Sequence, residues 1–142
     1  MVKDQSSPAS DGAPDSSASQ RCVLLVEDDR SLRRYLEVAL QRAGYRVIAT
    51  GDGIEALQQA HSSPVDIVIT DAIMPQLSGQ QLATMLRDNP KFARVPIVLL
   101  TGQDDKSTLN AADAAIDAFL YKPLNPDELR TCVAKLLNEN QK

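Results

Sequence analysis

Four segments of the sequence place residues with reactive or metal-binding side chains directly after a short apolar run. In chain order, these residues are Glu27, Asp28 and Asp29, then Asp71, Thr101 and Lys122. Carboxylates that lie close together repel one another unless a cation is present, and their oxygens suit a small hard ion such as Mg²⁺. A carboxylate beside a metal ion, with a lysine and a hydroxyl nearby, is an arrangement for phosphoryl transfer. We therefore expect Asp71 to act as a nucleophile that forms an aspartyl phosphate.

These side chains can act together only if the fold brings them to one place, and the apolar pattern predicts how. Five short apolar runs are CVLLV (22–26), YRVIAT (45–50), VDIVIT (65–70), VPIVLL (95–100) and DAFLY (117–121). At least three of these runs are nearly continuous Val, Ile and Leu, which is typical of strands that are covered on both faces. Segments with helical spacing separate the runs, which predicts βαβ units and a parallel sheet with helices on both sides. The functional crevice of such a sheet lies beyond the C-terminal ends of its strands.

The helical segments carry apolar residues three and four positions apart, which predicts one face packed on the sheet. The residues expected on these inward faces are Leu32, Tyr35, Leu36, Ala39, Leu40 and Ala43, then Ile54, Leu57 and Ala60, then Leu82, Met85 and Leu86, and finally Leu129, Cys132, Val133 and Leu136. Gly44 marks a helix end, and Asn125 before Pro126 marks a helix start. The segment 104–114 is poorer in apolar residues, so its helix is expected to pack least firmly. The basic residues expected on the solvent side of the first helix are Arg30, Arg33, Arg34 and Arg42.

The composition excludes several classes of protein. Among 142 residues, 19 are acidic and 15 are basic, and the resulting net charge of −4 argues against direct binding to nucleic acid. No apolar run approaches the roughly 18 residues of a membrane span, and no signal peptide is recognisable. Cys22 and Cys132 lie far apart and form no metal-binding pair. We expect a cytoplasmic protein with no membrane insertion.

The chain divides into a polar N-terminal segment and one domain. Residues 1–20 contain six serines and two prolines and few apolar side chains, which predicts a disordered tail or an interdomain linker. The two alternating periodicities begin near residue 21 and continue to about residue 140. We therefore expect a single folded domain over 21–140.

The reactive residues also lie within four longer motifs, VLLVEDD (23–29), TDAIMPQLSG (70–79), LLTG (99–102) and LYKP (120–123). With these motifs in this order, residues 21–140 resemble the receiver domain of two-component response regulators. The resemblance implies an α/β fold of the flavodoxin-like (βα)₅ type, with a five-stranded parallel sheet in the order 2-1-3-4-5 and helices on both faces. It also implies a role in phosphorelay signal transduction.

By this resemblance, Asp71 accepts a phosphoryl group from the phosphohistidine of a sensor histidine kinase or a histidine phosphotransfer protein. Mg²⁺, or Mn²⁺ in its place, would be held by Asp28, Asp71 and the backbone carbonyl of Ile73. Glu27 would act on the ion mainly through a coordinated water. Asp29 matches a variable position and is not expected to be a ligand.

The receiver family couples phosphorylation to a distant surface through a hydroxyl residue and an aromatic residue, which are Thr101 and Phe119 here. Thr101 would donate a hydrogen bond to the phosphoryl group, and Lys122 would neutralise its charge. The implied surface comprises the fourth helix, fifth strand and fifth helix, around residues 104–139. It would bind a downstream target protein that the sequence does not identify, in a monomer or a phosphorylation-dependent dimer. The Lys122–Pro123 peptide bond is a candidate for the cis form, which is common in this family.

Two positions that flank the path of attacking water in this family are Ile73 and Gln103. An isoleucine offers no hydrogen bond to that water and can shield the acyl phosphate. We therefore hypothesise slow self-dephosphorylation, on a scale of minutes or longer.

Several alternatives stay open on the sequence alone. Because only NENQK follows Leu137, we expect no output catalytic domain and no enzymatic activity beyond the domain's own phosphorylation and dephosphorylation. The chain is then either a stand-alone receiver or the receiver segment of a larger hybrid histidine kinase. A phosphatase of the haloacid-dehalogenase type also uses an aspartyl nucleophile, but it needs a second acid where Ile73 stands. A nucleotide-binding flavodoxin-like protein is disfavoured because no phosphate-binding loop follows the first strand.

Overall fold

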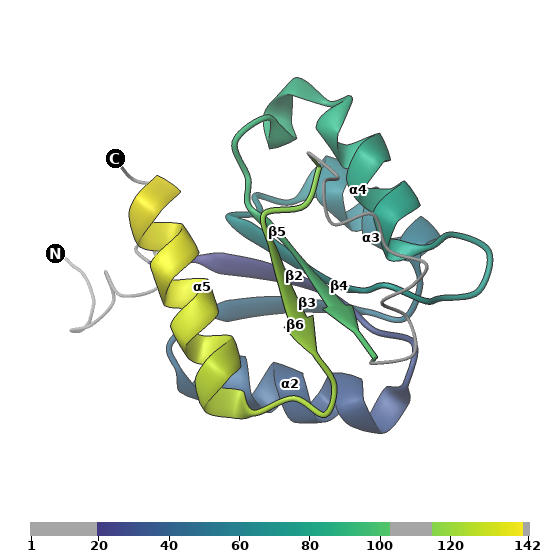
Figure 1. Cartoon of the computed structure of the whole chain (residues 1–142). Coiled ribbons are helices and arrows are strands. Elements are labelled where there is room, and N and C mark those ends of the chain that lie inside the picture. Colours follow the sequence, from purple (N-terminus) through teal and green to yellow (C-terminus); the bar gives the residue numbers. More distant parts are fainter. Residues whose placement is uncertain (1–19, 103–114, 141–142) are drawn as a thin grey trace, which may run out of the picture.

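In a computed structural model of the chain, which describes residues 20–102 and 115–140, five parallel strands form one sheet (Figure 1). The strands are β2 (Cys22–Val26), β3 (Arg46–Thr50), β4 (Ile67–Asp71), β5 (Ile97–Thr101) and β6 (Ala118–Tyr121). Their order across the sheet is β3-β2-β4-β5-β6. This is the predicted order 2-1-3-4-5, so the flavodoxin-like fold is confirmed.

Helices cover both faces of the sheet (Figure 1). In the described part of the chain they are α2 (Arg30–Arg42), α3 (Gly53–Ser62), α4 (Gly79–Arg87), the short 3₁₀ helix η2 (Pro90–Phe92) and α5 (Pro126–Asn140). Leu36 of α2 and Leu129 of α5 share one hydrophobic core with Leu25 of β2. Leu82 of α4 belongs to a second core, which contains Leu24. Neighbouring residues of β2 therefore enter opposite cores, because successive side chains of a strand point to opposite faces.

The predicted ends of two helices are confirmed. Gly44 follows α2 with a φ of 102°, a left-handed conformation that glycine adopts without steric cost. At the start of α5, the side chain of Asn125 accepts a hydrogen bond of 2.8 Å from the amide of Asp127. Pro126 is the first residue of that helix, where its missing amide hydrogen costs nothing.

Four residues expected on inward helix faces are exposed instead. Tyr35, Ile54 and Met85 have exposed fractions of 52%, 49% and 46%, and Ala43, the C-cap of α2, is exposed as well. On α2, Leu36 and Leu40 are buried, and Tyr35 precedes Leu36 by one position, which rotates it by about 100° around the helix axis. The apolar spacing therefore overestimated the width of the packed face.

Some predictions lie outside the described residues. These are the tail over residues 1–20, of which only Gln20 is described, and the helix at 104–114. Among the described ranges, no helix combines the length and the apolar composition needed to cross a membrane.

Candidate functional site

The C-terminal edge of the sheet brings together acidic residues from two neighbouring strands. Glu27 and Asp28 follow β2, and Asp71 is the last residue of β4. These strands pair in parallel, with Val26 opposite Thr70. One carboxylate oxygen from each of the three acidic residues lies within 4.8 Å of the others. Residues distant in sequence thus become neighbours because parallel pairing carries both segments to one edge.

Lys122 follows β6 and reaches the same cluster from beyond β5. Its Nζ lies 3.1 Å from Asp71 Oδ2 and 3.4 Å from Glu27 Oε1. Burial lowers the pKa of Lys122, but its contacts with Asp71 and Glu27 outweigh burial and hold that pKa above its ordinary value. Lys122 therefore carries a positive charge that offsets part of the negative charge of the cluster. The Lys122–Pro123 peptide bond is cis.

Glu27 is fully buried, which is unusual for a carboxylate. Its Oε2 accepts a hydrogen bond of 3.0 Å from the amide of Asp29, whereas Oε1 has no hydrogen-bond partner among the described residues. The 3.4 Å approach of Lys122 to Oε1 is an ion pair without hydrogen-bond geometry. Burial raises the pKa of Glu27 to about 7; Asp71 reinforces this shift, while the Asp29 amide and the Lys122 charge oppose it. A buried carboxylate oxygen without a donor, beside two further carboxylates, fits a bound divalent cation.

Asp29 has a different role from the two acids before it. Its Oδ1 accepts hydrogen bonds of 3.0 and 3.1 Å from the amides of Ser31 and Leu32, so it caps the N-terminus of α2. The run of three acids in the sequence therefore combines two acids of the cluster with one helix cap.

Thr101 and Phe119 lie on the two strands beyond the acidic cluster. Thr101 is the buried last residue of β5, and its carbonyl accepts a hydrogen bond of 2.8 Å from the amide of Lys122. Phe119 is half-buried in β6, in register with Leu99. The backbone thus links the hydroxyl residue, the lysine and the strand that carries the aromatic residue.

Ile73 stands two residues after Asp71, and 55% of it is exposed. Its side chain is therefore available at the surface beside the acidic cluster. Gln103, the second position expected to tune the phosphoryl lifetime, lies outside the described residues.

Gly79, which the sequence analysis assigned no role, packs directly on the backbone of the site. It begins α4, and a Cβ at this position would lie 2.2 Å from the carbonyl oxygen of Asp71. Glycine is therefore the residue that fits there. A glycine within the first turn of a helix, soon after a functional strand end, was the signal available in the sequence.

Arg33 also contacts the site, although it was expected on the solvent side of its helix. Its Nη1 donates a hydrogen bond of 2.8 Å to the main-chain carbonyl of Glu27, and the residue is only partly exposed. The expectation was wrong because a long side chain can extend along the protein surface to a neighbouring loop. No feature of the sequence distinguishes Arg33 from the arginine that follows it.

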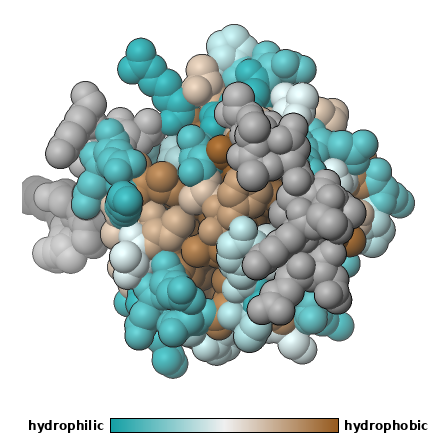
Figure 2. Space-filling view, viewed as in Figure 1, coloured by the Kyte–Doolittle hydropathy of each residue, from teal (hydrophilic) through white to brown (hydrophobic). Residues whose placement is uncertain are grey.

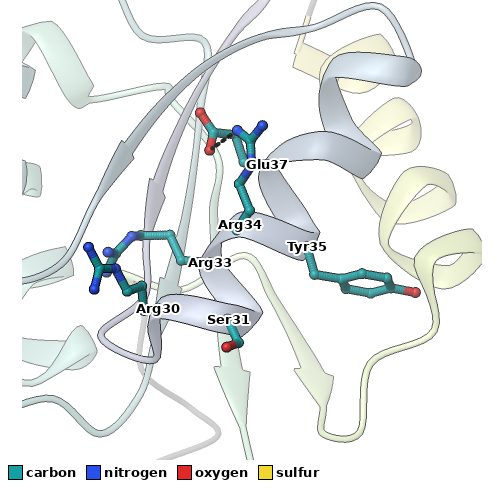
Figure 3. Close-up of a pocket in the computed structure, with 6 residues that line it drawn as sticks. All are labelled: Arg30, Ser31, Arg33, Arg34, Tyr35 and Glu37. Atoms are coloured by element: carbon teal, nitrogen blue, oxygen red, sulfur yellow. Dashed lines mark hydrogen bonds and ion pairs between the residues drawn. The ribbon is translucent and has the colours of Figure 1, made fainter.

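A surface pocket of about 620 Å³ lies on α2 next to this contact (Figure 3). The residues that line it are Arg30, Ser31, Arg33, Arg34, Tyr35 and Glu37. Arg34 pairs with Glu37 at 3.2 Å along the helix. The pocket contains none of the three clustered carboxylates, so the acidic cluster is a separate feature of the surface.

Comparisons with known proteins agree with this geometry. Residues 23–134 match the family described as the response regulator receiver domain. The sensor histidine kinase TmoS of Ectopseudomonas mendocina is 34% identical over 126 residues, which are 88% of this chain and 13% of that protein. The transcriptional regulatory protein GltR of Pseudomonas aeruginosa is 32% identical over 126 residues, which are 88% of this chain and 52% of that protein. The chain thus spans about half or less of these curated relatives.

Among solved structures, the chemotaxis response regulator CheY4 of Vibrio cholerae has a similar fold. The TM-score is 0.77 at 30% identity, and the match covers 83% of this chain and 99% of that chain. The sequence match, the strand order and the acidic cluster at the sheet edge all lead to one assignment. The chain belongs to the response regulator receiver domain family, the signalling domains of two-component phosphorelays.

Proposed function

We propose that this chain receives a phosphoryl group on Asp71 from the phosphohistidine of a sensor histidine kinase or a histidine phosphotransfer protein in the cytoplasm. The observation that carries the proposal is the cluster of Glu27, Asp28 and Asp71, with Lys122 Nζ 3.1 Å from Asp71 Oδ2. Positive charge beside a carboxylate offsets the repulsion that an approaching phosphoryl group would otherwise meet. The cluster therefore suits a carboxylate nucleophile better than a purely structural role.

In the proposed step, a carboxylate oxygen of Asp71 attacks the phosphorus of a phosphohistidine. An O–P bond forms while the P–N bond breaks, and the electron pair of the P–N bond leaves with the imidazole. The other ring nitrogen of that imidazole already carries a proton, so the ring departs neutral. Lys122 keeps its own proton and donates a hydrogen bond to a phosphoryl oxygen, and the hydroxyl of Thr101 donates another.

Four groups of this chain would hold Mg²⁺, or Mn²⁺ in its place. They are the side chains of Glu27, Asp28 and Asp71 and the backbone carbonyl of Ile73. A bound ion supplies positive charge to the phosphoryl oxygens during transfer. Oε1 of Glu27 has no hydrogen-bond donor among the described residues, and this supports the assignment because a cation stabilises a buried carboxylate oxygen that lacks a donor.

We infer that phosphorylation alters a protein-binding surface around residues 104–139 through Thr101 and Phe119. The hydrogen bond between Thr101 and Lys122 connects the site to β6, which carries half-buried Phe119. Apolar side chains gather on the face formed by β6 and α5 (Figure 2), where a groove of about 580 Å³ lies. The apolar residues that line this groove are Ala118, Leu120, Cys132 and Leu136. This groove supports an output by contact with a downstream protein or with a second phosphorylated copy.

We further propose that the phosphoryl group decays slowly, over minutes or longer. Ile73 is exposed beside Asp71 and offers no hydrogen bond to an attacking water. Gln103 is proposed as the second residue that flanks the path of this water.

A second context for the same chemistry is the receiver segment of a larger hybrid histidine kinase. The match to TmoS, in which the shared part is 13% of a sensor histidine kinase, supports this alternative. The two contexts differ in phosphodonor and output, whereas Asp71 has the same role in both.

The proposal is tested by intact mass after Mg²⁺ and acetyl phosphate are added, with Asp71→Asn as the control. We expect a Mg²⁺-dependent gain of one phosphoryl group in the wild type and none in the variant. Amide NMR shifts should then spread to Phe119 and to residues 104–139. If acetyl phosphate does not phosphorylate the wild type but beryllofluoride binds to it, the chain is a receiver that is selective for its phosphodonor. A wild type that responds to neither reagent contradicts the proposal.

A further inference from the structure

Arg33 lies outside the acidic cluster but holds the backbone from which two of its carboxylates project. Its Nη1 donates a hydrogen bond of 2.8 Å to the carbonyl oxygen of Glu27. Figure 3 shows Arg33 extending away from Tyr35, in a different direction from Arg34, which turns toward Glu37. Two consecutive arginines of one helix therefore make different contacts.

Gly51 provides the space that the Arg33 guanidinium occupies. A Cβ at Gly51 would lie 2.9 Å from Arg33 Nη1 and 3.7 Å from Cζ. A side chain at this position would push the guanidinium away from its present place. The chain thus offers a second way to disturb the hydrogen bond to Glu27 without changing the arginine itself.

The carbonyl that Arg33 holds belongs to the peptide unit between Glu27 and Asp28. The peptide bond is planar, so fixing this oxygen also fixes the direction of the Asp28 amide and Cα. Other contacts hold the neighbouring groups: the Glu27 amide donates to Thr50 at 3.1 Å, and the Asp29 amide donates to Glu27 Oε2 at 3.0 Å. The Arg33 hydrogen bond therefore restrains the one peptide plane that precedes Asp28.

This restraint matters most for Asp28, because Asp28 is exposed whereas Glu27 and Asp71 are buried. Packing restricts a buried side chain, while the direction of an exposed one depends more on its backbone. A hydrogen bond from a guanidinium is also stronger than one between neutral groups. The geometry thus gives Arg33 control over where the Asp28 carboxylate can point.

We propose that Arg33 is a positioning residue for the divalent cation site, acting through the peptide unit between Glu27 and Asp28. The inference rests on the proposed function of the acidic cluster. Residues that orient metal ligands typically change metal affinity by about 10–100-fold when they are replaced. We expect a change near the lower end of this range, because Arg33 acts through the backbone.

The test is a Mg²⁺ titration followed by amide NMR in the wild type and in single variants. We expect Arg33→Met to raise the Kd for Mg²⁺ about tenfold, and Gly51→Ala to raise it in the same direction. Arg33→Lys, which keeps one donor, should recover part of the affinity. Arg34→Met is the matched control and should leave the Kd unchanged, since the Arg34 side chain is 71% exposed and pairs within its own helix.

A second readout separates positioning from a general loss of stability. In the metal-free protein, Arg33→Met should shift the amide signals of Asp28 and Asp29 more than those of the two hydrophobic cores. The rate of phosphorylation by acetyl phosphate should return to the wild-type value at saturating Mg²⁺. If Arg33→Met does not fold, Arg33→Lys and Gly51→Ala carry the same test.

The outcomes distinguish this inference from the proposed function. A wild type that neither binds Mg²⁺ nor gains a phosphoryl group contradicts the proposed function. A wild type that does both, with Mg²⁺ affinities unchanged in the Arg33 and Gly51 variants, overturns only the role of Arg33. A loss of affinity in Arg34→Met equal to that in Arg33→Met also overturns it, because general charge would then explain the effect.

Discussion

Glu27 shows at the scale of one residue how this site differs from an ordinary surface. A carboxylate normally stays in water, yet Glu27 is fully buried with one oxygen that has no hydrogen-bond partner among the described residues. Burying an ionised group without full compensation is unfavourable, so burial shifts the equilibrium of Glu27 toward its protonated form. A bound cation would remove this cost and restore the ionised form.

The stability of the metal-free protein should therefore fall as pH rises between the ordinary carboxyl value of 4.5 and about 7. In this window the folded state binds more protons than the unfolded state, so the free energy of unfolding decreases with pH and levels off above it. The free energy of unfolding should fall by roughly 3 kcal/mol across this range. Urea unfolding across this range measures it. Glu27→Gln should make the free energy of unfolding less dependent on pH. If the variant shows the same pH dependence as the wild type, Glu27 is not the group responsible.

Ile73 allows a prediction about the lifetime of the phosphoryl group. Ile73→Asn should speed self-dephosphorylation several-fold, because the amide can hydrogen-bond the attacking water that the isoleucine cannot. Loss of phosphoprotein after removal of acetyl phosphate measures the rate. Met85→Gln, which changes an exposed apolar residue of α4, is the control. A wild-type half-life of a few seconds, or an Ile73→Asn variant that decays no faster, contradicts the hypothesis.

At the scale of elements, α4 fixes the end of β4, where Asp71 lies, by close contact. Gly79 begins the helix with its amide bonded to the carbonyl of Ala72 at 3.0 Å. A Cβ there would lie 2.2 Å from the Asp71 carbonyl oxygen and 2.8 Å from Leu99 Cδ1. The backbone at Asp71 therefore cannot keep its position if this residue gains a side chain.

Gly79→Ala should lower the free energy of unfolding by about 1–3 kcal/mol and slow phosphorylation of Asp71. Ser78→Ala is the matched control: it removes the cap that bonds the Gln81 amide and should cost about 1 kcal/mol without displacing Asp71. Denaturant unfolding and the acetyl phosphate reaction are measured on both variants. Equal loss of reactivity in the two would mean that stability alone, and not the position of Asp71, limits the reaction.

At the scale of the whole molecule, the acidic cluster couples the stability of the domain to its ligands. Three carboxylates and one lysine meet where separate strands end. Repulsion among the carboxylates therefore lowers the stability of this edge of the sheet. Removing the negative charge of Asp71 reduces the repulsion among the acids and leaves Lys122 paired with Glu27.

Asp71→Asn should therefore raise the melting temperature of the metal-free protein. Mg²⁺ should stabilise the wild type through binding to the folded state, by about 2.7 kcal/mol when its concentration is 100 times the Kd. The gain should be smaller in Asp71→Asn, which lacks one ligand. Thermal unfolding with and without Mg²⁺ checks both effects. Unchanged melting temperatures in both experiments would contradict the clustered-acid interpretation.

Much of the architecture could be predicted from the sequence because it depends on short-range patterns. Five apolar runs between helical segments determine a parallel sheet, and Gly44 and Asn125 act through local backbone chemistry that needs no tertiary partner. Because all strands of a parallel sheet run in the same direction, the acidic, hydroxyl and lysine residues that follow them then meet at one edge.

The tertiary structure alone decided which side chains meet and which do not. Apolar spacing could not show that Tyr35 is exposed, because the width of a helix's packed face depends on the elements beside it. Nor could it show that Arg33 reaches Glu27 while Arg34 stays on its helix, since both have the same side chain. Packing between distant segments leaves one oxygen of Glu27 without a hydrogen bond from any described residue. It also brings Gly79 against Asp71. Sequence patterns determine which elements form, whereas contacts between elements fix the distances on which the chemistry depends.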